Sequence, residues 1–411
     1  MAAISAPEWV NQQLFNGVLK QSIHDFQSIQ NFDVKAAISG GENFLTIVLR
    51  IQIQISLKDD KTKNISFILK LPLVSDLGDK HDFHDLFVVE NEMYDSIVPE
   101  LEAIYAKNAD LNIKFKPVHI KFIEPEPKCD YILMEDLHER GYKNLQRLDG
   151  LGQPEMESVL KKLAQWHAAS AQRVAELGPY GERYQLSYFG EESAKMLENM
   201  NNNFNLPFLE CMQQYNLNPD MMLFISNYTS RLTDLYIEFG KVDPEEFNVL
   251  NHGDFWCNNF MCKLNEDTSA IEDICFVDFQ LPKYGTPAQD LFCLLMTTSE
   301  FSIKLKKFDH FIAYYHEELV AHLKLLRYPK KVPTLAELQA NLQKNSLWAF
   351  VCAQRMLPVA LLPSTSDANI ENFMSSSDKG VAFKRKMLLN PSYKKQIEII
   401  LPWLIDRNYI N

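Results

Sequence analysis

The chain has 411 residues, of which 46% are hydrophobic and 23% charged, a composition typical of a globular protein with a large core. Its formal net charge of -13 argues against a nucleic-acid partner, which would require a basic surface. The seven cysteines are odd in number and include no Cys-x-x-Cys, so we expect reduced thiols and no zinc site.

The sequence also predicts where the protein resides. The N-terminal residues lack a basic segment followed by an apolar core, as a secretory signal would have. The longest apolar tract, 347–363, is interrupted by Gln354 and Arg355 and is too short to span a bilayer. We therefore expect a cytoplasmic protein that binds neither a membrane nor nucleic acid.

Alternating hydrophobicity follows a short amphipathic helix that we expect from residue 7. Ile and Leu occupy every second position across 47–55, and 65–71 returns as a second strand after a turn. This pattern predicts antiparallel strands with one face in a core. Gly40 and Gly41, in the first turn, could let backbone amides approach a phosphate, although a Gly-Gly hairpin turn explains them equally well.

The middle and the end of the chain contain further strands and long helices. Residues 118–123 and 131–134 read as a strand pair joined by a proline-rich turn. Beyond residue 154, apolar side chains recur in three- and four-residue steps. Three long helices are expected near the C-terminus, at 304–326, 335–361 and 380–405.

The most informative stretch lies between short apolar runs. Asp254 and Asn259 follow the run at 247–250, and Asp278 follows the run at 274–277. A strand–loop–strand hairpin would bring the three side chains to one point. Phosphoryl transfer from a magnesium nucleotide needs this set, because one carboxylate orients the attacking hydroxyl while an amide oxygen and a second carboxylate hold the metal. Each fragment alone is also common in turns, so the ordered set carries the prediction.

Four segments together resemble the aminoglycoside phosphotransferase and choline kinase superfamily: His252-Gly253-Asp254, Asn259, Val277-Asp278-Phe279-Gln280 and Pro287-Ala288-Gln289-Asp290-Leu291. Trp256, the Asn258-Asn259 pair and the Asp-Phe-Gln ending resemble more narrowly the ecdysteroid kinase-like family. The resemblance implies an α+β, bilobal protein-kinase-like fold. A small antiparallel-sheet lobe would span 1–137, and a large, mainly helical lobe would span 138–411.

The resemblance also implies the catalytic roles. Asp254 would orient or deprotonate the acceptor hydroxyl, while Asn259 and Asp278 would hold Mg²⁺ on the phosphates of ATP. Lys70, at the end of a strand, would bind the α- and β-phosphates. We prefer Glu90 to its competitor Glu92 as the partner of Lys70, since apolar residues of the same helix set a buried face near Glu90.

Further residues would bind the nucleotide or support the site. Asp290 would brace the 252–253 loop through hydrogen bonds, which is a structural role. The backbone groups of Glu135 and Leu137 would meet the adenine edge, with Met134 behind the ring. The implied nucleotide contacts are therefore Gly40, Gly41, Lys70, Glu90, Met134, Glu135 and Leu137.

The function implied is transfer of the γ-phosphate of ATP to a hydroxyl of a lipophilic alcohol, an ecdysteroid or a xenobiotic, by a monomer. Residues 180–247 are rich in aromatic and methionine side chains, a minority of which we expect to face such an acceptor. Only a few residues separate Gln280 from the 287–290 segment, which disfavours a protein substrate. The alternatives are a kinase of a cationic acceptor such as choline or an aminoglycoside, a nucleotide-binding pseudokinase or hormone-binding protein, and a thiol hydrolase that uses Cys257 and His252.

Overall fold

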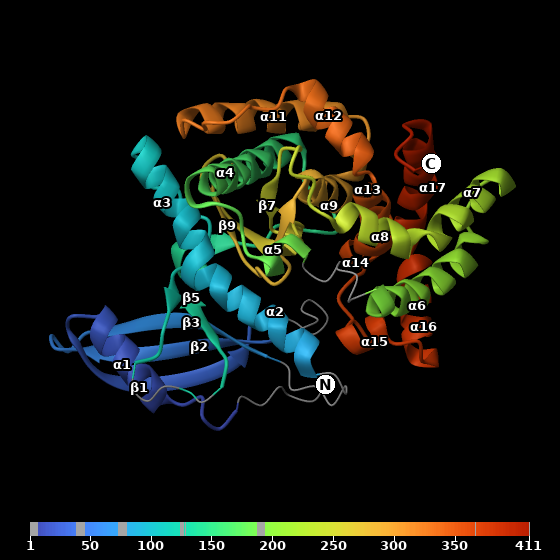
Figure 1. Cartoon of the computed structure of the whole chain (residues 1–411). Coiled ribbons are helices and arrows are strands. Elements are labelled where there is room, and N and C mark those ends of the chain that lie inside the picture. Colours follow the sequence, from blue (N-terminus) through green and yellow to red (C-terminus); the bar gives the residue numbers. More distant parts are fainter. Residues whose placement is uncertain are drawn as a thin grey trace.

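The computed structural model contains a small lobe built on one sheet and a larger, mostly helical lobe (Figure 1). It describes residues 7–37, 46–72, 80–123, 127, 129–186, 194–365 and 367–410. The predicted α+β class, with an antiparallel sheet towards the N-terminus and a helical C-terminal part, is confirmed. Gly40 and Gly41 lie outside the described residues, and so do the flanking residues of the turn that contains them.

Five strands form the sheet of the small lobe in the order β1-β2-β3-β5-β4, and all neighbours are antiparallel. The strands are β1 (Phe26–Ala36), β2 (Thr46–Leu57), β3 (Thr62–Pro72), β4 (His119–Ile120) and β5 (Ile132–Glu135). The alternation seen in the sequence is real, because Leu49, Ile51 and Ile53 are all buried on one face of β2.

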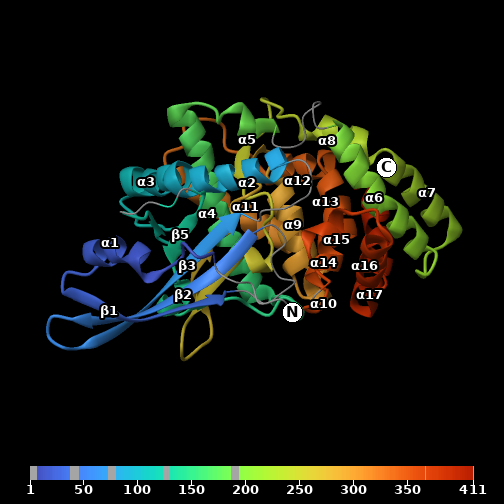
Figure 2. The same ribbon diagram turned by 90° about the horizontal axis from the view of Figure 1, so that it is seen from below.

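Helix α1 (Gln12–Ser22) covers this buried face (Figures 1 and 2). Its Phe15 ring lies 5.6 Å from the ring of Phe67 on β3, measured between centroids. The helix begins later than residue 7, where the sequence predicted it. The reason is the N-cap at Asn11, whose side chain accepts a hydrogen bond from the N–H of Gln13.

A continuous helical segment lies between the two lobes (Figure 1). It consists of α2 (Lys80–Glu92), the π-helical turn η1 (Met93–Ile97) and α3 (Val98–Ala109). The wide turn precedes Pro99, which has no N–H for a regular helical hydrogen bond. At the far end of the segment, the Tyr105 hydroxyl donates to the carbonyl oxygen of Gln165 at 3.0 Å, so α3 packs on the large lobe.

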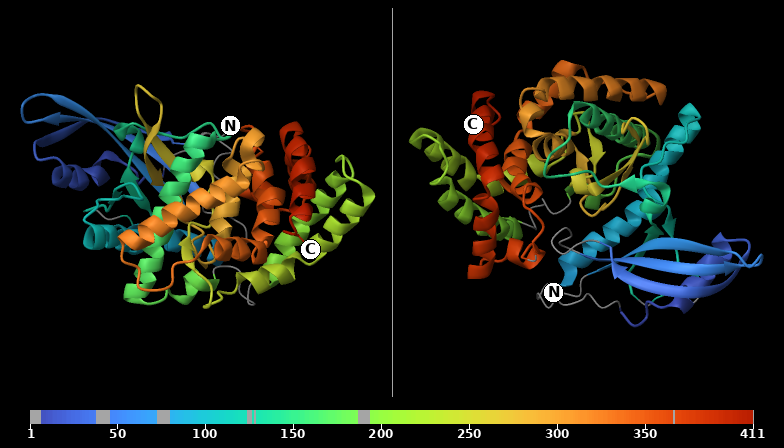
Figure 3. Two further views of the ribbon diagram at one scale, coloured as in Figure 1. Left: turned by 90° about the horizontal axis from the view of Figure 1, so that it is seen from above. Right: turned by 180° about the vertical axis from the view of Figure 1, so that it is seen from behind.

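Helices α4 (Gln153–Leu177) and α9 (Ala288–Thr298) occupy the centre of the large lobe, and every residue of α9 is buried. Helices α6, α7, α16 and α17 lie on the side away from the sheet (Figure 3). The other helices and helical turns among the described residues are η2 (Leu137–Arg140), α5 (Glu182–Leu186), α6 (Ala194–Met212), α7 (Pro219–Ser230), α8 (Leu232–Gly240), η4 (Cys257–Asn259), α10 (Phe301–Lys304), α11 (Phe308–Leu325), α12 (Leu335–Lys344), α13 (Leu347–Val351), η5 (Cys352–Met356), α14 (Leu357–Ala360), α15 (Ile370–Met374), α16 (Asp378–Leu388) and α17 (Pro391–Asp406). None of the described helices is both long enough and apolar enough to cross a membrane.

The long C-terminal helices predicted from the sequence are broken in the structure. The segment expected at 335–361 divides at Asn345 and Ser346 into α12 and α13, and then widens into the π-helical turn η5. The segment expected at 380–405 divides before Pro391, which begins α17 because its missing N–H is harmless at a helix start. Asn390 caps that start by accepting a hydrogen bond from the N–H of Ser392.

Two small sheets in the large lobe position the loops that carry Asp254, Asn259 and Asp278. Strand β7 (Val249–Asn251) pairs with β10 (Lys283–Gly285). The second sheet has the order β6-β8-β9. Its strands are β6 (Tyr142–Lys143), β8 (Phe260–Leu264) and β9 (Ile271–Phe276).

Candidate active site

The β8–β9 hairpin brings Asn259 and Asp278 to one point. Phe260 at the start of β8 lies opposite Phe276 at the end of β9, so the residues just outside the two strands are neighbours. The N–H of Val277 accordingly donates to the carbonyl oxygen of Asn259 at 2.9 Å. The antiparallel register thus produces the convergence that the sequence predicted.

Asp254 joins this point through Asn259. The Nδ2 group of Asn259 donates to Oδ2 and to the backbone carbonyl oxygen of Asp254, both at 2.8 Å. Because Nδ2 directs its protons to Asp254, the Oδ1 atom of Asn259 stays available as a ligand. The Oδ1 atom of Asp254 is buried and has no hydrogen-bond partner among the described residues.

Asp290, at the start of α9, holds the loop that carries Asp254. Its carboxylate accepts hydrogen bonds from the N–H groups of His252, at 2.7 Å, and Gly253, at 2.9 Å. Gly253 has a φ of 85°, and a Cβ atom there would lie 1.7 Å from the carbonyl oxygen of Leu281. Only glycine fits this position, both for its backbone conformation and for its space.

Lys70, Glu90 and Asp278 meet although they come from β3, α2 and the segment after β9. The Nζ atom of Lys70 donates to both carboxylate oxygens of Glu90, at 2.8 and 2.7 Å, and to Oδ1 of Asp278 at 2.6 Å. Glu92 points elsewhere: its side chain is 43% exposed and lies 3.4 Å from Arg183. The ion pair of Lys70 is therefore made with Glu90.

Burial and neighbouring charges change the acidity of these groups. Burial lowers the pKa of Lys70, but the carboxylates of Asp278 and Glu90 raise it above its ordinary value, so the ammonium stays charged. Burial raises the pKa of Glu90, and the charge of Lys70 opposes this only in part. Burial and the charge of Asp278 raise the pKa of Asp254 to about 7, while the hydrogen bond from Asn259 lowers it. A carboxylate that titrates near neutral pH is suited to accept a proton from a hydroxyl.

A cavity of about 520 Å³ lies between the lobes, and Lys70, Asn259 and Asp278 lie on its wall. The predicted adenine contacts Met134, Glu135 and Leu137, together with Glu90, also line it. The N–H of Glu135, however, donates to the carbonyl oxygen of Val118 at 3.0 Å and is not available to an adenine edge. We call this space the nucleotide cavity.

Asp136 also lines this cavity, although no role could be predicted for it from the sequence. Its Oδ2 atom accepts hydrogen bonds from Nε of Arg50 and from the Ser66 hydroxyl, both at 2.7 Å. These contacts tie the connection between the lobes to β2 and β3. No sequence signal points to them, because Arg50 and Ser66 lie 86 and 70 residues away from Asp136.

A second cavity, of about 260 Å³, contains Asp254 and is otherwise mostly apolar. We call it the acceptor cavity. From the segment 180–247, Met200, Phe204 and Tyr236 line it, whereas Phe208 and Tyr215 pack in the core of the lobe. The remaining lining residues are Gly253, Trp256, Leu281, Gln289, Cys293, Trp348, Val351, Cys352, Arg355, Met356, Val359, Phe373 and Met374.

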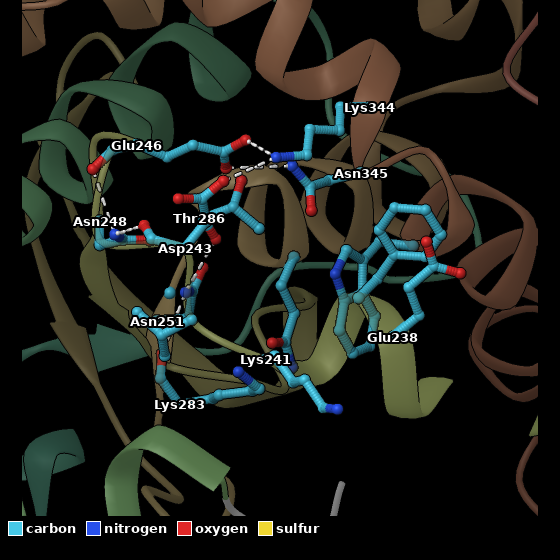
Figure 4. A pocket seen from close by; sticks show the side chains of 15 residues that line it. Glu238, Lys241, Asp243, Glu246, Asn248, Asn251, Lys283, Thr286, Lys344 and Asn345 are labelled. Carbon is cyan, nitrogen blue, oxygen red and sulfur yellow. Dashed lines mark hydrogen bonds and ion pairs between the residues drawn. The ribbon is translucent and has the colours of Figure 1, made fainter. Parts of the chain in front are cut away.

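A third, smaller cavity of about 180 Å³ has Asn251, Lys283 and Lys344 among its lining residues (Figure 4). Most of its lining residues are polar or charged, and Lys344 forms ion pairs there with Asp243 at 2.8 Å and Glu246 at 2.6 Å. The side chain of Asn251 donates to the carbonyl oxygen of Lys283 at 3.0 Å, which ties β7 to β10 (Figure 4). No residue predicted for catalysis or nucleotide binding is among the described residues of this wall.

The geometry does not favour a thiol hydrolase built on Cys257 and His252. Burial raises the pKa of Cys257 to about 12, whereas a nucleophilic cysteine needs a lowered pKa. The Sγ atom of Cys257 contacts the carbonyl oxygen of Leu145 at 3.7 Å. His252 uses Nε2 to donate to the carbonyl oxygen of Val277 at 2.9 Å. Its ring is therefore bound to the segment that follows β9 and not to Cys257.

Comparison with known proteins agrees with this geometry. No curated protein matches the chain. The model of the ecdysteroid kinase-like family matches residues 40–328. This range covers more than half of the chain and includes Lys70, Glu90, Asp254, Asn259 and Asp278. The chain belongs to the ecdysteroid kinase-like family.

Proposed function

We propose that the protein transfers the γ-phosphoryl group of ATP to a hydroxyl of a lipophilic alcohol, an ecdysteroid or a xenobiotic. Membership of the family supports a small-molecule kinase. One observation supports phosphoryl transfer to a lipophilic alcohol in particular. The Asp254–Asn259 hydrogen bond joins the apolar acceptor cavity, where Asp254 lies, to the nucleotide cavity, where Asn259 lies.

The residues of the nucleotide cavity suit ATP with magnesium. Lys70 would bind the phosphates, because its ammonium is fixed by Glu90 and directed at Asp278. Bound Mg²⁺ would neutralise charge on the phosphate oxygens during transfer. The amide oxygen of Asn259 and the carboxylate of Asp278 are ligands of the hard oxygen type that it prefers.

Such a site needs few protein ligands. No group of three His, Cys, Asp or Glu side chains converges within the described part of the chain. Magnesium usually takes only one or two carboxylates and completes its octahedron with phosphates and water. One carboxylate and one amide, at Asp278 and Asn259, therefore fit the ion when a nucleotide supplies the other oxygens.

Asp254 would act on the acceptor. Its Oδ1 atom is buried without a protein partner, and the residue lines the apolar cavity, so a substrate hydroxyl could donate to this oxygen. A cationic acceptor such as choline fits less well, because the positive charge of Arg355 in the same cavity would repel it. We also expect a cytoplasmic monomer; the free state of all seven cysteines fits a reducing compartment and bears only on the location.

Purified protein with magnesium and ATP tests the proposal against a panel of alcohols, with phosphorylated products identified by mass spectrometry. The panel should contain steroids and phenols on one side and choline and aminoglycosides on the other. We expect products from the first group. Efficient phosphorylation of choline or an aminoglycoside, with none of any steroid or phenol, would contradict the proposed acceptor class.

A further inference from the structure

Arg355 is a buried cation in the wall of the acceptor cavity. Its side chain is 5% exposed, and it lies on the π-helical turn η5 between α13 and α14. The N–H of Leu357 donates to the carbonyl oxygen of Cys352, five residues earlier, which defines the wide turn. Pro358 follows and cannot supply a regular helical hydrogen bond. Such turns are frequent at functional sites.

Neutral groups surround the guanidinium. Its Nη2 atom donates to Oδ1 of Asn201 at 2.7 Å and to Oδ1 of Asn205 at 3.3 Å. Its Nε atom donates to Oε1 of Gln354 at 3.3 Å. The rings of Phe204 and Tyr236 lie 5.5 and 5.7 Å from it. No carboxylate forms an ion pair with Arg355 in the part of the chain that the structure describes.

These neighbours hold the guanidinium in one orientation. Asn201 donates from Nδ2 to the Thr233 hydroxyl at 2.7 Å, which fixes the amide that receives Nη2. Gln354 donates from Nε2 to Oδ1 of Asn205 at 3.2 Å, so the amides around Arg355 are connected to one another. A positioned arginine loses little freedom when it binds a ligand.

The hydrogen-bond inventory leaves one nitrogen for a ligand. Arginine has five N–H donors and stays protonated in proteins. The bonds from Nε and Nη2 use one side of the group, while Nη1 has no acceptor among the described residues. A buried charge is costly unless an acceptor or counter-ion compensates it. Asp254 and Arg355 are the charged side chains among the described lining residues, and they come from different elements, the loop that follows β7 and the turn η5.

We propose that Arg355 binds an oxygen acceptor, a carbonyl or a carboxylate, on the apolar skeleton of the alcohol whose hydroxyl meets Asp254. This inference rests on the proposed function, because it places the alcohol in the acceptor cavity. The apolar residues between would contact the skeleton, while Asp254 and Arg355 would fix its two polar ends. Arg355 is thus a specificity residue and takes no part in phosphoryl transfer.

The test compares matched alcohols that share one apolar skeleton and carry a ketone, a carboxylate or a methylene group at a distant carbon. Binding is measured by calorimetry in the presence of magnesium and a non-hydrolysable ATP analogue, and kcat/KM is measured with ATP. Wild-type protein should prefer the ketone or the carboxylate over the methylene compound by about tenfold or more, the scale of a hydrogen bond to a charged group. The preferred member identifies the oxygen class.

Variants then assign the preference to Arg355. Arg355→Met should lose the discrimination while the affinity for the ATP analogue stays unchanged, and Arg355→Lys should retain part of it. Arg385→Met, which removes an exposed arginine paired with Glu210, is the matched control and should behave as wild type. Equal discrimination in wild type and a folded Arg355→Met would overturn the inference.

The wild-type protein alone keeps the inference falsifiable if the variants do not fold. Equal binding of all three compounds to wild type would also overturn the role of Arg355. The proposed function fails separately. If the oxygenated alcohol binds preferentially but is not phosphorylated, the binding role of Arg355 stands and the kinase activity towards such alcohols does not.

Discussion

The carboxylate of Asp254 lines the acceptor cavity and accepts a hydrogen bond from Asn259, which lines the nucleotide cavity. The acceptor oxygen and the transferred phosphoryl group would therefore meet beside these two side chains. Asp278 adds negative charge at the same point, and that charge helps to raise the pKa of Asp254. One small group of residues thus sets both the geometry and the acidity of the site.

The pH dependence of activity should report on Asp254. Its pKa is raised to about 7, and only the ionised carboxylate can accept a proton, so activity is low below this pH and rises as pH increases through it. The value of kcat/KM for the alcohol should therefore show a rising limb above the range of an ordinary carboxyl group. Asp254→Asn should lose both the limb and at least about 10²-fold in kcat. A limb near pH 4, the region of an ordinary carboxyl group, would contradict the assignment.

Lys70 and Glu90 should act as one unit in ATP binding. Lys70→Met removes the phosphate contact and also leaves Glu90 buried without its counter-ion. A double-mutant cycle with Glu90→Gln, read from the ATP dissociation constant, should give a coupling free energy of about 1–3 kcal/mol. Glu92→Gln is the control and should leave binding unchanged, since Glu92 is exposed and pairs with Arg183 instead. Additive losses would show that the pair does not act together.

Sequence patterns identified the side chains that converge at the candidate site, but they did not identify Arg355. Asp254, Asn259 and Asp278 lie beside recognisable strands, so the hairpin that brings them together could be predicted. The only sequence feature that points to Arg355 is its charge inside the apolar tract 347–363. Its partners Asn201 and Asn205 are 154 and 150 residues away, and no local pattern reveals contacts at such a separation.

At the scale of elements, β8, β9 and α9 hold the site. The hairpin register places Asn259 beside the segment that carries Asp278, and the first turn of α9 supplies Asp290 to the catalytic loop. Strands could be predicted from alternation because one face of each is buried. The helix break at Asn345 and Ser346 could not be predicted, because it carries no proline or glycine, whereas Pro391 marks the start of α17 in the sequence.

Asp290→Ala should loosen the catalytic loop. The change removes the acceptor of two backbone N–H groups, and each buried donor left without a partner costs about 1–3 kcal/mol. We expect a free energy of unfolding lower by about 2 kcal/mol or more, measured by denaturant titration, together with reduced kcat. Asp309→Ala, which removes an exposed ion pair with Arg407, is the control and should cost about 1 kcal/mol or less. Equal losses for both variants would refute the bracing role.

At the scale of the whole molecule, the two lobes share one nucleotide cavity. Lys70 comes from the sheet, Glu90 from the helical segment between the lobes, and Asp278 from the large lobe. The hydrogen bonds of Lys70 to Glu90 and Asp278 therefore connect the sheet to the large lobe at this cavity. The lobed architecture was implied by the family resemblance, and the order of strand and helix patterns agrees with it. The cavity volumes and the position of the acceptor cavity required the three-dimensional structure.

The central claim is that Asp254 acts on the acceptor while Asn259, Asp278 and Lys70 serve the nucleotide. The most direct measurement follows ADP, phosphorylated alcohol and the affinity for magnesium ATP in parallel, for wild type and Asp254→Asn. Wild type should form ADP and product in equal amounts, and the variant should bind magnesium ATP with nearly unchanged affinity but form no product. Wild-type rates of product formation in a folded Asp254→Asn protein would contradict the account.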